Sequence, residues 1–340
     1  MAKIRKSRKS KVWKYWREYK WSNVFEMLKN MKEKPKQCTE RCDGKVVVIT
    51  GATSGIGYYT AKKYASMGAR VITLNRSKEK SEALVRDIER EFGIKIEYFL
   101  ADLSSLKDIY KAAEFLSCLK EPIDVLIHNA GVYLGKRTLT VDGLETNFVV
   151  HYLAPFIINY HLLEKYKKDK KGRIILVSSE GYRFAVWGLN LDDLQFEKAR
   201  YTGLKAYGSA KLAQILTMHI FADLLKPYNV TINAMHPGMV RTNTGKDNST
   251  IYRLFKKRFI DSISQTPEIS AQARYYLGIS KEVENVTDKF FHLTKIEELA
   301  PPAKDMEEAK KLWDLTIKMI DSFGLGIKKS VDFVGSDGCA

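Results

Sequence analysis

The sequence predicts a single α/β domain built on a doubly wound parallel sheet, preceded by a basic helical arm. Three observations support this prediction. Short apolar segments alternate with segments of helical length between residues 45 and 236, which is the pattern of parallel βαβ units. A glycine-rich turn follows the first apolar segment. The first 36 residues hold thirteen Lys or Arg and three Glu, and therefore +10 of the net charge of +17.

The apolar segments are the predicted strands, because short runs without polar alternation are typical of strands buried on both faces. They are Lys45–Thr50, Arg70–Asn75, Ile96–Ala101, Val125–His128, Arg173–Ser178 and Thr231–His236. The predicted helices between them are Tyr58–Met67, Lys78–Phe92, Leu106–Leu119, Glu145–Lys168 and Leu204–Leu225. In such sheets ligands bind outside the carboxyl ends of the strands, so the residues directly after each strand are candidate site residues.

Composition limits the classes of protein. The chain has 340 residues, of which 45% are hydrophobic, enough for one large domain with extensions. No run of 18 or more apolar residues occurs, and the basic N-terminus lacks an apolar core, so we expect neither a membrane-spanning helix nor a secretory signal peptide. The four irregularly spaced cysteines predict free thiols in an intracellular, reducing compartment and no metal site. They are Cys38, Cys42, Cys118 and Cys339.

The glycine-rich turn is Thr50-Gly51-Ala52-Thr53-Ser54-Gly55-Ile56-Gly57, and a predicted helix follows it. Glycine lets the backbone turn sharply and approach a ligand closely. The helix N-terminus then offers free N–H groups and a positive dipole end to a pyrophosphate. We therefore predict a dinucleotide site at this turn. The alternative is a tight strand–helix connection that binds nothing.

The catalytic candidates are Tyr207 and Lys211, which form a Tyr-x-x-x-Lys motif inside a predicted helix. Positions four apart lie on one helix face, so the ammonium group can favour the phenolate. An isolated Tyr has a pKa of about 10, which is poorly matched to acid–base catalysis at neutral pH. Lowering that pKa by two units requires about 2.7 kcal/mol of differential stabilisation. A nearby Lys in a partly dry site can contribute to it.

Together these features resemble the short-chain dehydrogenase/reductase family over roughly residues 44–320. The glycine spacing is Thr-Gly-x-x-x-Gly-x-Gly, and the later motifs follow in the family's order: Asp102-Leu103, Asn129-Ala130-Gly131, Ser179, Tyr207 with Lys211, and Pro237-Gly238 with Val240 and Thr242. The resemblance implies a Rossmann-type fold and an oxidoreductase that uses NAD(P) on a CH–OH group.

The resemblance also assigns roles. Asp102 would contact the adenine, Ser179 would donate a hydrogen bond to the substrate carbonyl, and Lys211 would hold the nicotinamide ribose. Val240 and Thr242 would contact the nicotinamide carboxamide. The predicted cofactor-binding residues are Gly51, Ser54, Gly55, Ile56, Gly57, Arg76, Asp102, Leu103, Asn129, Ala130, Gly131, Tyr207, Lys211, Pro237, Gly238, Val240 and Thr242.

Cofactor selection is predicted from the end of the second strand. A carboxylate there would bind the ribose 2′-OH and favour NAD, but this chain has Asn75 and then Arg76. Because a guanidinium can pair with a 2′-phosphate, we favour NADP(H) over NAD(H). The alternative is that Arg76 only stacks on the adenine or points to solvent.

One position departs from the family's pattern. The family usually has an Asn in the helix after the fourth strand, where it anchors a water of the proton relay, and the matching residue here is His151. His151 could hold that water, impair catalysis or only pack, and these alternatives stay open. The catalytic prediction is therefore Ser179, Tyr207, Lys211 and His151. The alternative function is a catalytically impaired NADP(H)-binding regulatory or scaffold protein tethered by its basic arm.

Several segments resemble the retinol dehydrogenase-like branch of the family. They are Asn190–Lys198, Thr266–Ala273, Val286–Phe291 and the stretch around Ala309–Ile320. This resemblance implies a lipophilic alcohol or carbonyl substrate, such as a retinoid, a steroid or a long-chain aldehyde or ketone. The predicted walls are Tyr182, Phe184 and Trp187, with Thr244–Ile263 as a mobile lid. For any single aromatic residue, core packing is the commoner role.

The basic arm, residues 1–36, has three interpretations. Trp21, Val24, Phe25 and Leu28 recur at helical spacing, which favours docking on an anionic membrane surface, our first choice. The others are nucleic-acid binding, which we do not expect, and a solvated tail or a helix docked on the domain. We expect the arm and its linker to occupy residues 1–43, the domain 44–325 with the lid at about 240–290, and a tail 326–340. Homo-oligomerisation, common in the family, stays open.

Overall fold

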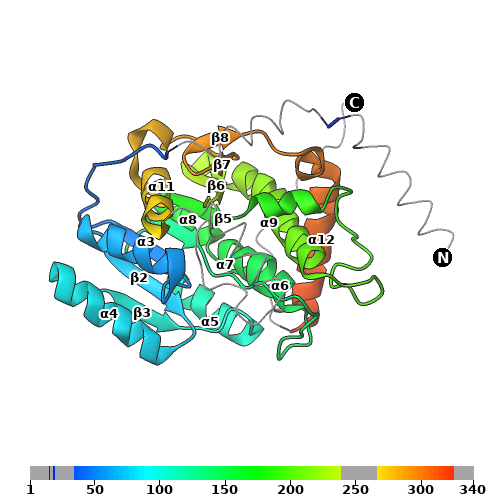
Figure 1. Cartoon of the computed structure of the whole chain (residues 1–340), viewed down its shortest axis with the longest axis horizontal. Helices are drawn as coiled ribbons and strands as arrows, with labels where there is room; N and C mark the ends of the chain where they lie inside the picture. Colours follow the sequence, from blue (N-terminus) through cyan, green and yellow to red (C-terminus); the bar gives the residue numbers. More distant parts are fainter. Residues whose placement is uncertain (1–14, 16–17, 20–33, 239–265, 325–340) are drawn as a thin grey trace.

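The structure is a computed structural model that describes residues 15, 18–19, 34–238 and 266–324 (Figure 1). Within this part of the chain one sheet of eight strands has the order β3-β2-β1-β4-β5-β6-β7-β8. All neighbouring pairs from β3 to β7 are parallel, and β8 is antiparallel to β7. The order reverses between β1 and β4, as in a doubly wound sheet. The predicted Rossmann-type fold is confirmed.

The strands are short, and the central ones are fully buried. They are β1 (Val46–Thr50), β2 (Arg70–Asn75), β3 (Glu97–Leu100), β4 (Val125–His128), β5 (Gly172–Val177), β6 (Val230–His236), β7 (Phe290–His292) and β8 (Lys295–Glu297). Every residue of β1 and β4 is buried, because helices cover both faces of the sheet. This burial explains why these strands have no polar alternation.

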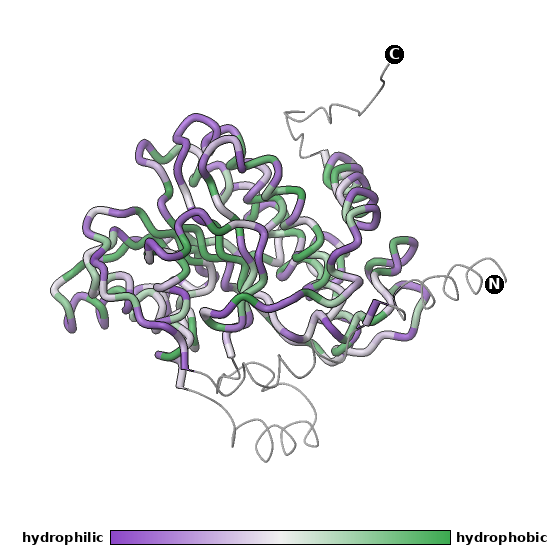
Figure 2. The backbone as a smooth tube through the Cα atoms, turned by 90° about the horizontal axis from the view of Figure 1, so that it is seen from above, coloured by the Kyte–Doolittle hydropathy of each residue, from purple (hydrophilic) through white to green (hydrophobic). Residues whose placement is uncertain are grey.

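Helices form a layer on each face. One layer contains α3 (Gly55–Ser66), α4 (Lys78–Phe92) and α11 (Pro267–Ile279), and the other contains α5 (Leu106–Ser117), α7 (Ala154–His161), α9 (Gly203–Leu225) and α12 (Met306–Ser322). Successive residues of a strand point to opposite faces. Val46 and Val48 therefore pack under the second layer, and Val47 and Ile49 under the first. Figure 2 shows many of the hydrophobic residues in the interior of the domain.

The helix predicted over residues 145–168 is interrupted, which corrects the prediction of one long helix. The observed elements are α6 (Thr146–Phe148), a π-helical turn η1 (Val149–Leu153), α7 and α8 (Leu163–Asp169). Pro155 lies in the first turn of α7, and it has no N–H to return to the carbonyl one turn earlier. The backbone widens into the π turn just before it. His151 lies in the middle of this turn.

Several C-terminal elements were not predicted individually. Helix α11 packs on α3 and on β5, so the first described residues of the predicted lid region form part of a helical layer. Residues 244–263, predicted as a mobile lid, lie outside the described residues, as does the tail. β7 and β8 have three residues each, which is too short for a periodicity signal.

Described residues of the arm contact the domain, among them Lys36, whose backbone N–H donates to Thr294 Oγ1 at 2.8 Å. Tyr15 is 1% exposed, and its hydroxyl donates to Asp305 Oδ2 at 2.7 Å, at the start of α12. The Tyr19 hydroxyl donates to Val186 O at 3.3 Å. These contacts are those of an arm docked on the domain at this point. The apolar face that favoured a membrane surface, residues 21–28, lies outside the described residues. No helix among the residues described here has the length and apolar character needed to cross a membrane.

Candidate active site

The glycine-rich turn connects β1 to α3 at the carboxyl end of the sheet. Gly51 has a φ of +67°, and a Cβ on Gly57 would lie 2.2 Å from Gly51 O. The turn therefore closes this tightly only with glycine at both positions. Ser54 stands at the N-cap of α3 but makes no side-chain capping bond, so its hydroxyl does not satisfy the first N–H groups of the helix. Such an end fits a phosphate group.

The motif after β4 braces this turn. Asn129 Nδ2 donates to Thr50 O at 2.9 Å and to Gly51 O at 2.7 Å. The backbone N–H groups of Asn129 and Ala130 both donate to Thr50 Oγ1 at 2.9 Å. The side chain of Asn129 thereby fixes where the glycine turn leaves the sheet.

Arg76 and Asp102 lie at the same rim of the sheet, after β2 and β3. The side chain of Arg76 is 75% exposed, and its Nη1 is 4.0 Å from Asp102 Oδ2. An exposed pair at this distance is weak, so it leaves the guanidinium able to turn toward a phosphate. Asn75 has a different role from its neighbour, because it is buried and its Oδ1 accepts the Ala52 N–H at 2.8 Å. Asn75 shapes the glycine turn.

Tyr207, Ser179 and Lys211 are brought together by α9 and the segment after β5. A Cβ on Gly181 would lie 2.7 Å from Tyr207 Cε1 and 3.3 Å from Ser179 Oγ, so both side chains flank this glycine. Ser179 Oγ accepts the Gly181 N–H at 3.0 Å. Lys211 Nζ lies 5.9 Å from the centroid of the Tyr207 ring. The serine hydroxyl, the phenol and the ammonium group therefore share one corner of the sheet edge.

Lys211 is buried, and its Nζ donates to Val177 O at 2.6 Å. Burial, and then the positive charge of Arg274, lower the pKa of Lys211 to about 7. The ammonium group is therefore close to losing its proton at neutral pH. A bound anion would favour the charged form and restore it.

His151 packs its ring edge-on against Tyr207, with 5.0 Å between the ring centroids. Its Nε2 is 2.6 Å from Val132 O and 3.2 Å from Val132 N, and the shorter contact assigns the proton to Nε2. Nδ1 then carries a lone pair, and it is buried without a hydrogen-bond partner among the described residues. Burial keeps the pKa of His151 well below its usual value, so the imidazole is neutral. Gly131 makes room for it, because a Cβ there would lie 2.7 Å from His151 Cε1.

Arg274 in α11 is a site candidate that the sequence did not reveal. It is fully buried, and its Nη1 donates to Thr60 Oγ1 at 3.0 Å. The Thr60 hydroxyl donates to Ile56 O at 2.7 Å in the first turn of α3. Within the described residues, Arg274 Nε and Nη2 have no acceptor, and burial lowers the pKa of the guanidinium to about 9. A charged residue on the buried face of a helix was the available signal.

The remaining predicted residues have less specific surroundings. Gly238 follows β6 with a φ of +77°, whereas Val240 and Thr242 lie outside the described residues. Tyr182, predicted as a wall, is a core residue, because its ring packs on Phe290 and its hydroxyl accepts the Ala300 N–H at 2.9 Å. Phe184 is 57% exposed, and Trp187 is half-buried.

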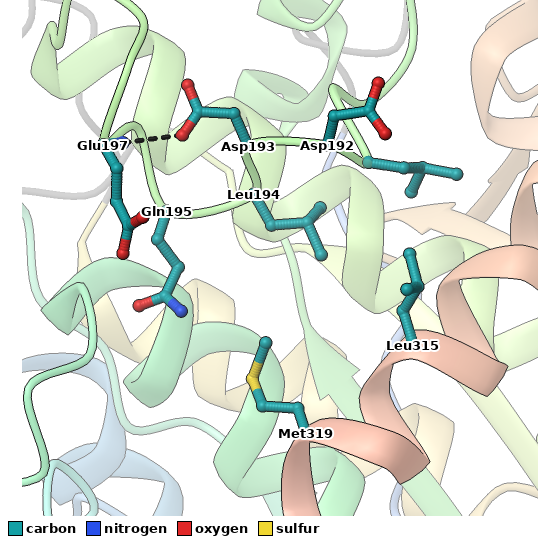
Figure 3. Close-up of a pocket in the computed structure, with 8 residues that line it drawn as sticks. Asp192, Asp193, Leu194, Gln195, Glu197, Leu315 and Met319 are labelled. Carbon is teal, nitrogen blue, oxygen red and sulfur yellow. Dashed lines mark hydrogen bonds between the residues drawn. The ribbon is translucent and has the colours of Figure 1, made fainter.

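A separate pocket of about 180 Å³ lies between the loop after β5 and α12 (Figure 3). Its lining consists of Leu191, Asp192, Asp193, Leu194, Gln195, Glu197, Leu315 and Met319. The Asp193 carboxylate is committed to the loop itself, since it accepts the backbone N–H groups of Glu197 and Ala199. None of the candidate catalytic residues lines this pocket, so it is distinct from the active site.

Comparison with known proteins agrees with this geometry. A family model described as short chain dehydrogenase matches residues 45–189 and 195–252. Retinol dehydrogenase 13 of Mus musculus is 34% identical over 282 residues, which cover 82% of this chain and 84% of that protein. Retinol dehydrogenase 14 of Homo sapiens is 35% identical over 295 residues, covering 82% and 86%.

Solved structures share the fold. A protein from Mycobacterium paratuberculosis described as uncharacterized is 27% identical, with a TM-score of 0.65, and the match covers 86% of this chain and 97% of that one. A short chain dehydrogenase of Shigella flexneri, complexed with NADP, is 22% identical, with a TM-score of 0.59, covering 76% and 100%. At that identity the second match indicates only the fold.

Proposed function

We propose, from the premise that this chain belongs to the short-chain dehydrogenase/reductase family and is retinol dehydrogenase-like, that it interconverts a lipophilic alcohol and its carbonyl with NADP(H), using Tyr207 as general acid/base. Family membership makes the chain an oxidoreductase that acts on CH–OH donors with an NAD(P) cofactor. The observation that carries the finer proposal is the approach of Tyr207 and Ser179 to Gly181, with Lys211 Nζ 5.9 Å from the centroid of the Tyr207 ring.

The site fits a dinucleotide. The α3 N-terminus has no side-chain cap from Ser54, and Arg274 has two buried N–H directions without an acceptor among the described residues. The glycine turn would hold the pyrophosphate, Arg76 a 2′-phosphate, and Lys211 the nicotinamide ribose. The cofactor supplies or accepts the hydride when it is bound. We add Arg274 to the proposed phosphate-binding residues, because a buried guanidinium whose pKa is lowered by burial favours an anionic partner.

Tyr207 is the proposed proton donor during carbonyl reduction and the acceptor during alcohol oxidation. Its hydroxyl proton goes to the substrate oxygen, and Ser179 donates a hydrogen bond to the same oxygen. Lys211, one turn along α9, stabilises the phenolate that remains. Each unit by which it lowers the phenol pKa corresponds to about 1.4 kcal/mol.

His151 is proposed to hold a water of the relay that returns the proton to Tyr207. Its Nδ1 lone pair can accept a hydrogen bond from that water, because Nε2 is already committed to Val132 O. The imidazole is neutral, so it adds no positive charge beside Lys211. In this respect a histidine can replace the family's asparagine. The alternative is that the bulkier ring displaces the water and impairs turnover.

The substrate is proposed to be lipophilic because the matched relatives are named retinol dehydrogenases. Phe184 and Trp187 follow Ser179 closely and leave apolar surface at least partly exposed. We propose an intracellular protein whose arm also contacts an anionic membrane surface, from which such a substrate would enter.

The decisive experiment measures oxidation of NADPH and of NADH with a panel of lipophilic aldehydes and ketones, including retinal. We expect turnover with NADPH, its loss in Tyr207→Phe with NADPH binding retained, and a large decrease in Ser179→Ala. Ser178→Ala is the matched control, because Ser178 is the adjacent serine and is outside the proposed machinery. Tight NADPH binding by the wild type without turnover on the whole panel would favour the impaired scaffold.

A further inference from the structure

A cluster of charged and polar side chains lies where the short helix η2 (Glu180–Phe184) meets the β7–β8 hairpin. Helix η2 directly follows Ser179 in the chain. It contains Glu180 and Arg183 from η2, His292 from β7 and Glu297 from β8. His292 and Glu297 are each only 3% exposed, and the Glu180 side chain is 17% exposed. None of the four has a part in the proposed proton transfer.

Arg183 neutralises only one side of the cluster. Its Nε donates to Glu180 Oε2 at 2.5 Å, and its Nη2 donates to Glu297 Oε1 at 2.8 Å. The guanidinium therefore binds one oxygen of each carboxylate. Among these four side chains, two carboxylates face one guanidinium. Buried charged groups in proteins are paired or coordinate metal ions.

The opposite side of the cluster consists of acceptor atoms. One potential ligand atom from each of Glu180, His292 and Glu297 lies within 4.8 Å of the other two, and His292 Nδ1 is 3.9 Å from Glu297 Oε2. No donor from the described part of the chain reaches Glu180 Oε1 or His292 Nδ1, although both atoms are buried. Buried acceptors without a donor are costly and rare, so this arrangement indicates a cation between them.

A proton satisfies only part of this cluster. A proton shared by the two carboxylates would still leave His292 Nδ1 without a partner. A metal ion satisfies Glu180 Oε1 and His292 Nδ1 at once.

The donor set selects the class of metal. One imidazole nitrogen with two carboxylate oxygens suits Zn²⁺, whereas Mg²⁺ and Ca²⁺ prefer oxygen alone. A tetrahedral site with bonds of about 2.1 Å has ligand–ligand edges of about 3.4 Å. The 3.9 Å separation of His292 Nδ1 and Glu297 Oε2 therefore requires only a small inward movement of the two side chains.

We propose that Glu180, His292 and Glu297 form a binding site for Zn²⁺ that fastens η2 to the β7–β8 hairpin, with Arg183 holding the outer carboxylate oxygens. The sequence-based expectation of no metal site rested on cysteine spacing. These three ligands come from segments far apart in the chain and form no local motif. Because Glu180 directly follows Ser179, the ion would hold the segment that carries the proposed substrate-orienting hydroxyl.

The test uses the full chain after EDTA treatment and desalting. Zn²⁺ alone is titrated into the protein, and bound zinc is measured by elemental analysis beside the melting temperature. We expect one tightly bound equivalent and a higher melting temperature with zinc. Glu297→Gln and His292→Asn should each weaken zinc binding by at least about tenfold and abolish the rise in melting temperature.

The matched control is Glu298→Gln. Glu298 is the next residue along, and its carboxylate pairs with Lys304 at 2.8 Å, so this variant should bind zinc as the wild type does. Zinc bound equally by the wild type, Glu297→Gln and His292→Asn would place the ion elsewhere, for example on cysteine, and overturn the proposal. A wild type that binds no zinc and melts unchanged would show that the cluster holds only a proton, which also overturns it.

Discussion

Gly181→Ala is the sharpest test of how Tyr207 and Ser179 are held. A Cβ at position 181 would lie 2.7 Å from Tyr207 Cε1 and 3.3 Å from Ser179 Oγ. The backbone of Gly181 has no positive φ, so alanine introduces no conformational strain of its own. Its effect is therefore a local collision with the two proposed catalytic side chains.

The size of the effect follows from that distance. Carbon atoms in ordinary contact are roughly 3.5–4.0 Å apart, so the phenol ring has to move by about 1 Å. A displacement of about 1 Å in a reacting group can lower a rate by roughly 100-fold, which corresponds to about 2.7 kcal/mol in the activation barrier. We expect kcat to fall by about this factor. Because the glycine turn and Arg76 are untouched, the Kd for NADPH should change by no more than about twofold.

The assay compares kcat, KM and the Kd for NADPH in the wild type and Gly181→Ala, using the best substrate of the aldehyde and ketone panel. Thermal melting checks that the variant folds. A folded Gly181→Ala enzyme with kcat within about threefold of wild type would refute the reasoning, because Tyr207 and Ser179 would then tolerate displacement.

Further predictions concern the cofactor, the relay and the arm. Arg76→Ala should raise the Kd for NADPH by about tenfold and leave that for NADH nearly unchanged, measured by nucleotide fluorescence; equal effects on both would exclude a 2′-phosphate contact. His151→Asn should keep most of kcat, and His151→Ala should lose more than about tenfold; no change in either would remove His151 from the relay. Burial lowers the pKa of Lys211 to about 7. Above pH 7, Lys211 must therefore take up a proton from solution when NADPH binds. NADPH affinity should therefore fall as pH rises from 7 to 9, by up to about tenfold per pH unit. In Lys211→Met the Kd for NADPH should not change over this pH range. Removal of residues 1–36 should reduce co-sedimentation with anionic liposomes; equal binding by both forms would reject a membrane role.

The features that the sequence predicted share one property. The strands and the residues directly after them are local in sequence, and the doubly wound sheet collects the strand ends at one edge. Asn129 after β4 and Ser179 after β5 lie at these strand ends, and the resemblance to the family's motifs singled them out before any contact was known. The geometry of the glycine turn was predictable because a strand, a turn and a helix are contiguous.

The features that could not be predicted depend on contacts between distant segments. Asn75 was considered only for its lack of a carboxylate, but its side chain braces the glycine turn through Ala52. Arg274 and the Glu180 cluster acquire their meaning from residues on other elements. The π turn at His151 arises from Pro155 and tertiary packing, both of which override the helical periodicity that predicted one continuous helix.

Two buried cations, Lys211 and Arg274, make this part of the domain favourable for an anion. The positive charge of Arg274 contributes, after burial, to lowering the pKa of Lys211, so the two cations repel each other. Arg274 in α11 reaches α3 through Thr60, whose hydroxyl donates to Ile56 O in the first turn of that helix, where the free N–H groups add further positive potential. An anionic group near both cations would offset their repulsion. Part of the electrostatic cost of burying them would thus become binding free energy, and the same step would favour the charged form of Lys211 for its role beside Tyr207.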